Sequence, residues 1–92
     1  MNASDESQAP IVRALILEMM PPGGGENPRI FGDGAALDSL GLVNLLADVE
    51  YRLADKFGRE IVLASERAMS RNRSPFRDVD ALTGYILELL AE

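Results

Sequence analysis

One serine, Ser39, lies where a Gly-containing segment meets a long run of helix-forming residues, and a hydroxyl at such a junction is well placed to carry a phosphate. Gly32 and Gly34 precede it, and a Leu- and Val-rich stretch follows. The first N–H groups of a helix lack intrahelical partners and the helix dipole is positive there, so a phosphate is stabilised. Position alone favours a simpler role, because Ser is also a common helix N-cap.

Most other chemistry is excluded by the absence of Cys and His. Without them the chain has no disulfide, thiolate nucleophile, imidazole base or Cys/His metal site. Asp33 and Asp38 lack the spacing and the closing Glu of a calcium-binding loop. Gly23-Gly24-Gly25 lacks the Gly-Lys-Ser/Thr ending of a phosphate-binding loop and predicts a flexible connector. We therefore expect no enzyme and no metal site, and any reactive group would be borrowed.

The composition indicates one small acidic domain. The chain has 92 residues, of which 47% are hydrophobic, and a net charge of −6 from 15 acidic and 9 basic residues. This balance argues against nucleic-acid binding and favours a protein partner with a basic face. No apolar run approaches the ~20 residues of a membrane span, and the polar N-terminus is unlike a secretory signal. We expect a cytoplasmic monomer.

The first third of the chain predicts a helix followed by a long connection. Residues 1–9 are polar and are expected to be a flexible N-terminus before a domain at 10–91. A helix from Gln8 to Met20, with Ser7 as its cap and Pro10 in its first turn, would present one apolar face: Ile11, Val12, Leu15, Ile16 and Met19. Residues 23–37 form a Gly-rich connection. Its apolar Ile30, Phe31 and Leu37 predict that it packs onto the core, and a loop of this length is often functional.

The strongest helical pattern runs from Ser39 to Phe57. Asp38 or Ser39 can cap its start, and Gly58 is a C-terminal stop. Its inward stripe is expected at five positions with helical spacing: Leu42, Leu45, Leu46, Val49 and Leu53.

The remaining residues predict a short helix and a last long one. Ile61 and Leu63 are expected to point inward, and one or two helical turns are expected at 65–69. The basic segment Arg67–Arg77 is interpreted as a solvated surface. Asp78 is expected to cap a helix from Val79 to about Leu90 that buries Val79, Leu82, Ile86 and Leu89 or Leu90. The product is an all-α bundle of three main helices and a short one.

Asp38-Ser39-Leu40 at the start of a Leu/Val-rich helix resembles the phosphopantetheine attachment motif of acyl carrier proteins. The likeness extends over residues 10–90. It includes the long first loop, the helix end at Phe57-Gly58 and the last helix that follows Phe76-Arg77-Asp78. The resemblance implies the acyl-carrier four-helix bundle of a free-standing carrier.

The resemblance also implies a function for the motif. A phosphopantetheinyl transferase would attach 4′-phosphopantetheine to Ser39, and the thiol of the arm would carry acyl groups for enzymes of fatty-acid, polyketide or related lipid biosynthesis. Asp38 and Leu40 would flank the arm. Acyl-loading and acyl-modifying enzymes would dock on Leu40 and Val43, guided by Asp38, Asp48 and Glu50. The acyl chain would lie among six aliphatic side chains: Leu45, Leu46, Val49, Ile61, Leu82 and Ile86.

Several residues depart from the fatty-acid type and leave the cargo open. Gly41 stands where an acidic residue is frequent, and Asn44, Tyr51 and Arg52 make this helix less acidic than usual. A polyketide, a modified lipid or an aminoacyl group remains an alternative cargo, although Asp before the Ser argues against a peptidyl carrier. The alternative from another class is a helical protein-interaction domain in which Ser39 is an unmodified cap.

Overall fold

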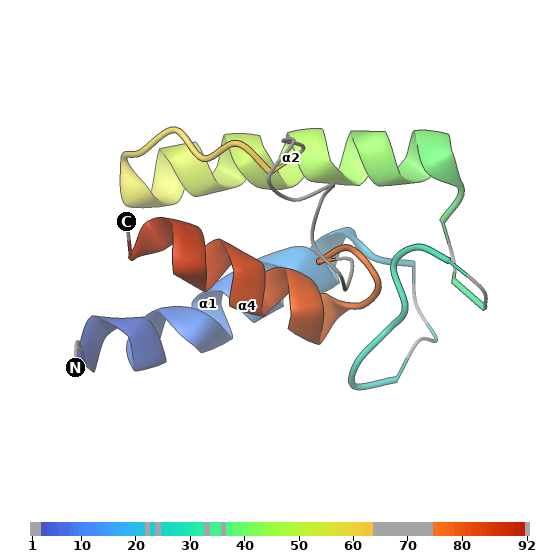
Figure 1. Cartoon of the computed structure of the whole chain (residues 1–92), viewed down its shortest axis with the longest axis horizontal. Coiled ribbons are helices and arrows are strands. Elements are labelled where there is room, and N and C mark those ends of the chain that lie inside the picture. Colours follow the sequence, from blue (N-terminus) through green and yellow to red (C-terminus); the bar gives the residue numbers. More distant parts are fainter. Residues whose placement is uncertain are drawn as a thin grey trace.

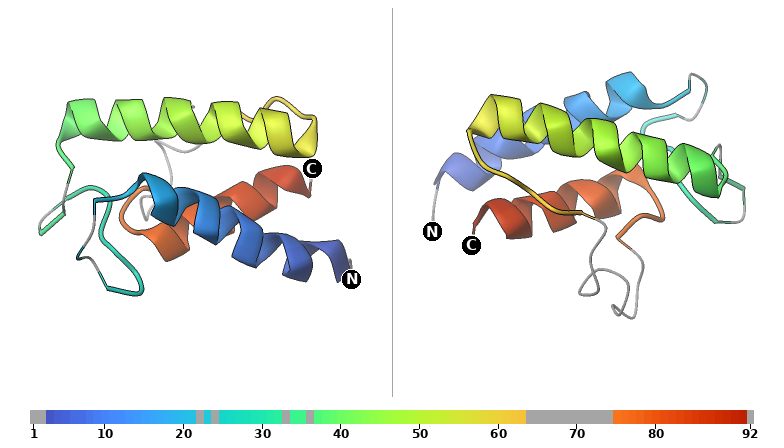
Figure 2. Two further views of the ribbon diagram at one scale, coloured as in Figure 1. Left: turned by 180° about the vertical axis from the view of Figure 1, so that it is seen from behind. Right: turned by 90° about the horizontal axis from the view of Figure 1, so that it is seen from above.

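The residues that the computed structural model describes form three helices in two layers. They are α1 (Ala3–Met19), α2 (Ser39–Phe57) and α4 (Val79–Leu90). The structure describes residues 3–21, 23, 25–32, 34–35, 37–63 and 75–91, with side chains from residue 8 onward. α1 and α4 lie side by side, and α2 lies over both of them (Figures 1 and 2). α1 runs opposite to α2 and α4, so α2 and α4 start at the same end of the molecule (Figure 1).

One hydrophobic cluster connects the three helices. It contains residues from every element and from both long connections: Val12, Leu15, Ile16, Met20, Ile30, Leu45, Leu46, Val49, Leu53, Ile61, Leu63, Phe76, Val79, Leu82, Tyr85 and Ile86. The radius of gyration is 12.5 Å, close to the ~12 Å expected of a compact chain of this length. The expectation of an all-α, compact fold is therefore confirmed.

The first helix begins earlier than the sequence predicts. It starts at Ala3, so the predicted start at Gln8 and the Ser7 cap are wrong, and Pro10 lies in its interior rather than in its first turn. The missing N–H of Pro10 would cost least in a first turn, which is why the start was expected just before it. The predicted apolar face is also partly wrong. Val12 and Ile16 are fully buried, but Ile11 is 40% exposed and lines a groove together with residues of α2.

The second helix matches its predicted bounds. Gly58 ends it in the left-handed conformation (φ 68°), with its N–H donated to the Ala54 carbonyl at 2.9 Å. Of the five positions expected to face inward, four are buried and Leu42 is half-buried. Because the buried row faces the core, the opposite side of α2, which includes Leu40, faces solvent.

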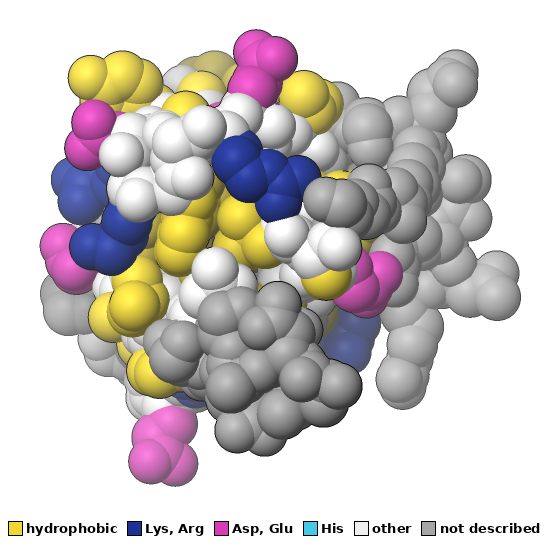
Figure 3. Space-filling model, turned by 90° about the vertical axis from the view of Figure 1, so that its left-hand side faces the viewer, with side chains coloured by type: hydrophobic (Ala, Val, Ile, Leu, Met, Phe, Trp, Pro, Cys, Tyr) yellow, Lys and Arg dark blue, Asp and Glu magenta, His cyan; other side chains and the backbone are white. Residues whose placement is uncertain are grey.

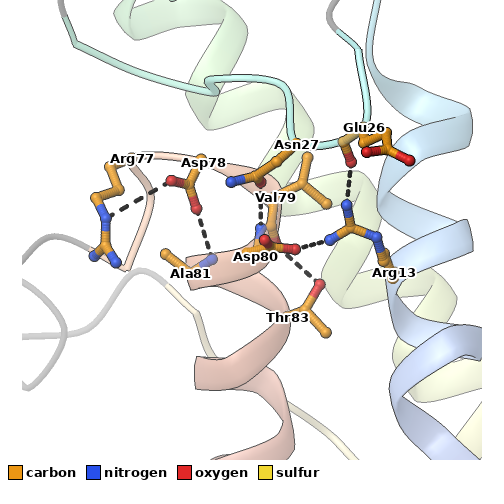
Figure 4. A network of polar contacts seen from close by, with 9 residues as sticks. All are labelled: Arg13, Glu26, Asn27, Arg77, Asp78, Val79, Asp80, Ala81 and Thr83. Atoms are coloured by element: carbon orange, nitrogen blue, oxygen red, sulfur yellow. Dashed lines mark hydrogen bonds and ion pairs between the residues drawn. The ribbon is translucent and has the colours of Figure 1, made fainter.

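The long connection caps the last helix. The N–H of Val79 donates to the Pro28 carbonyl at 3.1 Å. The N–H of Asp80 donates to Asn27 Oδ1 and that of Ala81 to Asp78 Oδ1, at 2.8 and 2.7 Å (Figure 4). The first three N–H donors of α4 are thus satisfied, two of them by residues far away in sequence. These bonds hold Asn27 and Pro28 against the start of α4.

Arg13, which belongs to α1, connects this helix to the long connection and to α4. Its guanidinium donates to the Glu26 carbonyl and pairs with the Asp80 carboxylate (Figure 4). Ile30 completes the attachment, since its N–H donates to the Arg77 carbonyl at 2.9 Å and its side chain is fully buried. The loop packs on the core as expected, but Phe31 is 38% exposed and is not one of its anchors.

The segment after α2 is held by two charged side chains. Glu50 Oε2 accepts a hydrogen bond from the Leu63 N–H at 2.8 Å, and Arg59 Nη1 donates to the Leu90 carbonyl at 2.5 Å. The positive charge of Arg59 also interacts favourably with the negative C-terminal end of the α4 dipole. Figure 3 shows this end of the molecule, where hydrophobic side chains gather in the middle of the face and Lys and Arg side chains lie beside them.

The expected fourth helix falls in residues 64–74, which lie outside the described part of the chain, as do Arg67, Arg71 and Arg73. Between residues 3 and 63 and from 75 to 91, the described backbone contains no strand, only an isolated bridge between Arg29 and Asp78. None of the helices described is both long and apolar enough to cross a bilayer.

The contact between the loop and α4 has a measurable energetic consequence. Asn27→Ala should lower the free energy of unfolding by about 1 kcal/mol, because the Asp80 N–H loses its acceptor. Asn44→Ala, at an exposed position of α2, is the control and should change stability by less than about 0.5 kcal/mol. Urea denaturation measures both variants, and equal effects would contradict a capping role for Asn27.

Candidate functional site

The start of α2 is capped by Asp38. This residue is extended (φ −90°, ψ −174°), its Oδ1 accepts the Gly41 N–H at 2.8 Å, and its carbonyl accepts the Leu42 N–H at 2.9 Å. The sequence left Asp38 and Ser39 as alternative caps, and the geometry selects Asp38. Ser39 is therefore the first helical residue and has no capping role.

The Ser39 side chain is exposed. Within the described residues, no hydrogen bond engages its hydroxyl. The hydroxyl lies in the first turn of a 19-residue helix, where the helix dipole favours a negatively charged substituent. A phosphodiester on Ser39 would therefore meet a favourable field without displacing an existing contact among those residues.

An apolar stripe follows Ser39 along the outer side of α2. Leu40 is 69% exposed and Val43 is 61% exposed, so the two predicted anchors are accessible. The stripe continues at helical spacing through the exposed Ala47 to Tyr51, whose exposure of 77% is the highest of the large hydrophobic residues described. Tyr51 is not among the docking residues expected from the sequence. Its helical spacing from Leu40 and Val43 was the signal that could have added it.

The charged residues proposed as docking guides differ in their surroundings. Asp38 and Asp48 are exposed. Glu50 is half-buried, and its carboxylate holds the Leu63 N–H. Glu50 therefore stabilises the segment after α2, and its contribution to docking stays a prediction. Asp33, the other acid considered near Ser39, lies outside the described residues.

The six residues expected to line an acyl pocket are all buried. Leu45, Leu46 and Ile61 are each 4% exposed, and Val49, Leu82 and Ile86 are fully buried. The structure thus brings the six together in the same hydrophobic cluster. A groove of about 480 Å³ lies elsewhere, on the side of α1 and α2, and none of the six lines it. Its walls include Ile11, Ala14, Tyr51 and Lys56.

These features give the site its chemistry: an exposed hydroxyl at a helix N-terminus, an apolar stripe beside it and an aliphatic core beneath. No family model, no curated protein and no solved structure matches this chain.

Proposed function

We propose that this protein is an acyl carrier whose Ser39 bears a 4′-phosphopantetheine arm. One observation carries the proposal: Asp38 performs the capping role, so Ser39 is left exposed as the first residue of α2. Because Asp38 already caps α2, the exposed Ser39 is not needed as a cap. The Asp38-Ser39-Leu40 motif and its place after a long loop support the same function.

The local residues fit the arm and its attachment. The Ser39 oxygen forms a bond to the phosphorus of the phosphopantetheine group of coenzyme A, the bond from that phosphorus to adenosine 3′,5′-bisphosphate breaks, and the hydroxyl proton passes to a base of the transferase. The N-terminal dipole of α2 stabilises the resulting phosphodiester. The arm supplies a terminal thiol that holds acyl groups as thioesters, a group that a chain without Cys lacks. Leu40 and Asp38 flank the attachment point.

Attachment is tested with purified protein, coenzyme A, Mg²⁺ and a broad-specificity phosphopantetheinyl transferase. Intact mass should increase by one phosphopantetheine unit in the wild type and in Ser7→Ala, a serine control in α1. Ser39→Ala should remain unmodified with an unchanged helical circular dichroism spectrum. A wild type that stays unmodified by several transferases contradicts the carrier function, and a modified Ser39→Ala would move the attachment elsewhere.

The outer stripe of α2 supports docking of the transferase and of acyl-loading enzymes. Leu40 and Val43 would be the apolar anchors, while the exposed Asp38 and Asp48 attract basic partner surfaces. Charged groups at an exposed rim act mainly on the association rate and are screened by salt. We therefore expect arm transfer to slow as ionic strength rises.

Val43→Ala tests this surface against a matched valine. It should reduce kcat/KM of the transferase by about fivefold, since about 1 kcal/mol of apolar burial is lost on docking. Val62→Ala is the control, because Val62 is 55% exposed but lies outside α2. Equal losses for the two variants would place docking elsewhere.

The second candidate is an interaction domain that needs no arm. The exposed Leu40, Val43 and Tyr51 favour it, because an apolar stripe on a helix serves protein contacts with or without a cofactor. The attachment experiment separates the two functions. The cargo of the carrier, whether fatty acyl, polyketide or aminoacyl, is a question for the loading enzymes.

A further inference from the structure

Gly41 lies in the first turn of α2, against the residues that precede it. Its N–H donates to Asp38 Oδ1. A Cβ built on Gly41 would lie 3.3 Å from that same oxygen and 3.3 Å from both Cβ and Cδ2 of Leu37. These separations are shorter than ordinary van der Waals contacts, so a side chain at position 41 would displace Leu37, Asp38 or both.

The other helical glycine provides the comparison. Gly84, in α4, is exposed, and apart from its chain neighbours and the backbone of its own helix no heavy atom lies within 4 Å of the position its Cβ would occupy. Alanine is favoured over glycine inside helices by about 1 kcal/mol. At Gly84 that gain is free of steric cost, whereas at Gly41 it is opposed by three close contacts. An alanine at position 41 therefore gains its helix preference only to the extent that Leu37 and Asp38 give way by a few tenths of an ångström.

The side chain that occupies the space beside Gly41 is that of Leu37. Asp38 is the N-cap, so Leu37 and Leu42 occupy the two positions that form a hydrophobic staple. Both side chains are half-buried and pack against the core cluster. Leu37 thereby fixes the angle at which the chain enters α2, and it packs over the Cα of Gly41. The same stretch of backbone positions Asp38 and Ser39. An acid at position 41 would be suited to a capping box, but Leu37 packs closely there.

We propose that Gly41 is a positioning residue for the modification of Ser39. It keeps Leu37 and the Asp38 cap close to the first turn, and this arrangement sets the direction from which the Ser39 oxygen meets the phosphorus of coenzyme A. The inference rests on the proposed carrier function. It assigns the departure from the carrier motif at position 41 to the geometry of attachment.

Gly41→Ala and Gly84→Ala test the proposal as a matched pair. With saturating carrier and coenzyme A, Gly41→Ala should lower the transferase kcat by about tenfold or more and leave both KM values unchanged, because a small displacement of a reacting atom is costly. Gly84→Ala should react at the wild-type rate. In ¹⁵N spectra of the unmodified proteins, Gly41→Ala should shift the amides of residues 37–42, and Gly84→Ala should leave them in place.

Thermal melting supplies a readout that needs no transferase. Gly84→Ala should melt about 4 °C above the wild type, and Gly41→Ala should not share this gain. Leu37→Ala removes one of the close contacts, so Gly41→Ala should reduce kcat less in the Leu37→Ala background than in the wild type. If Gly41→Ala is unfolded at the assay temperature, the kinetic comparison is made between Leu37→Ala/Gly41→Ala and Leu37→Ala, where a fall in kcat is still expected.

The outcomes are separable. A wild type that takes no arm removes the carrier function itself. A wild type that is modified while Gly41→Ala reacts with the same kcat, or with only a raised KM for the carrier, overturns the positioning role and leaves the carrier function intact. Equal stabilisation by the two alanines would show that position 41 has no steric constraint.

Discussion

Leu82→Ala should lower the free energy of unfolding by about 2–5 kcal/mol. Leu82 is fully buried in α4, within the one cluster that joins the three helices. Its truncation removes apolar burial and leaves a cavity that neighbouring side chains fill only in part. Domains of this size have total stabilities of about 5–15 kcal/mol, so the loss is a large fraction of the whole.

Leu40→Ala is the control for Leu82→Ala, because it makes the same change at a leucine that is 69% exposed. Its unfolding free energy should differ from the wild type by less than about 0.5 kcal/mol. Guanidinium titration followed by circular dichroism measures both variants. If Leu40→Ala destabilised the protein as much as Leu82→Ala, the outer side of α2 would be part of the core.

The octanoylated protein should melt about 5–10 °C above the holo protein. Each methylene moved from water into the core contributes about 0.8 kcal/mol, and a ligand held by the folded state alone raises its stability. The six buried residues proposed as the lining are aliphatic and can change rotamer to admit a chain. Since these side chains are at most 4% exposed, acyl entry has to open the cluster, and the gain is smaller than full burial would give.

The acetylated protein is the control for the octanoylated one, because it has the same thioester with almost no chain. Amide shifts in the octanoylated protein should concentrate near Val49, Ile61 and Ile86. Shifts near Ile11 and Tyr51 would place the chain in the groove on the side of α1 and α2 and contradict the interior site. Equal melting of all forms, with shifts confined to residues 38–43, would leave the chain in solvent.

Local signals in the sequence determined two of the three helices. The bounds of α2 and α4 follow from caps and stops that act within a turn: Asp38 and Asp78 accept N–H groups three residues ahead, and Gly58 adopts the left-handed conformation. The inward rows were predictable for the same reason, since helical periodicity places one face against the core. Val49, Leu53, Val79, Leu82 and Ile86 are all buried as expected.

The motif at Ser39 was visible in the sequence, but the division of roles within it was not. Asp38 and Ser39 are both good N-cap residues, and propensity does not choose between adjacent candidates. The backbone geometry makes Asp38 the cap and leaves Ser39 exposed. The close approach of Leu37 to Gly41 was equally hidden, because a glycine in a sequence does not show what lies against its Cα.

Only the tertiary structure decided what depends on residues far apart in the chain. Composition did not reveal that Asn27 and Pro28 satisfy the first N–H groups of α4, or that Arg13 bridges the loop and Asp80. The partial exposure of Ile11, which lines the groove on the side of α1 and α2, was likewise set by how the helices pack. Caps and periodicity act over one or two turns and are written in neighbouring residues. Long-range partners are chosen by the packing of the whole chain, so a local pattern does not specify them.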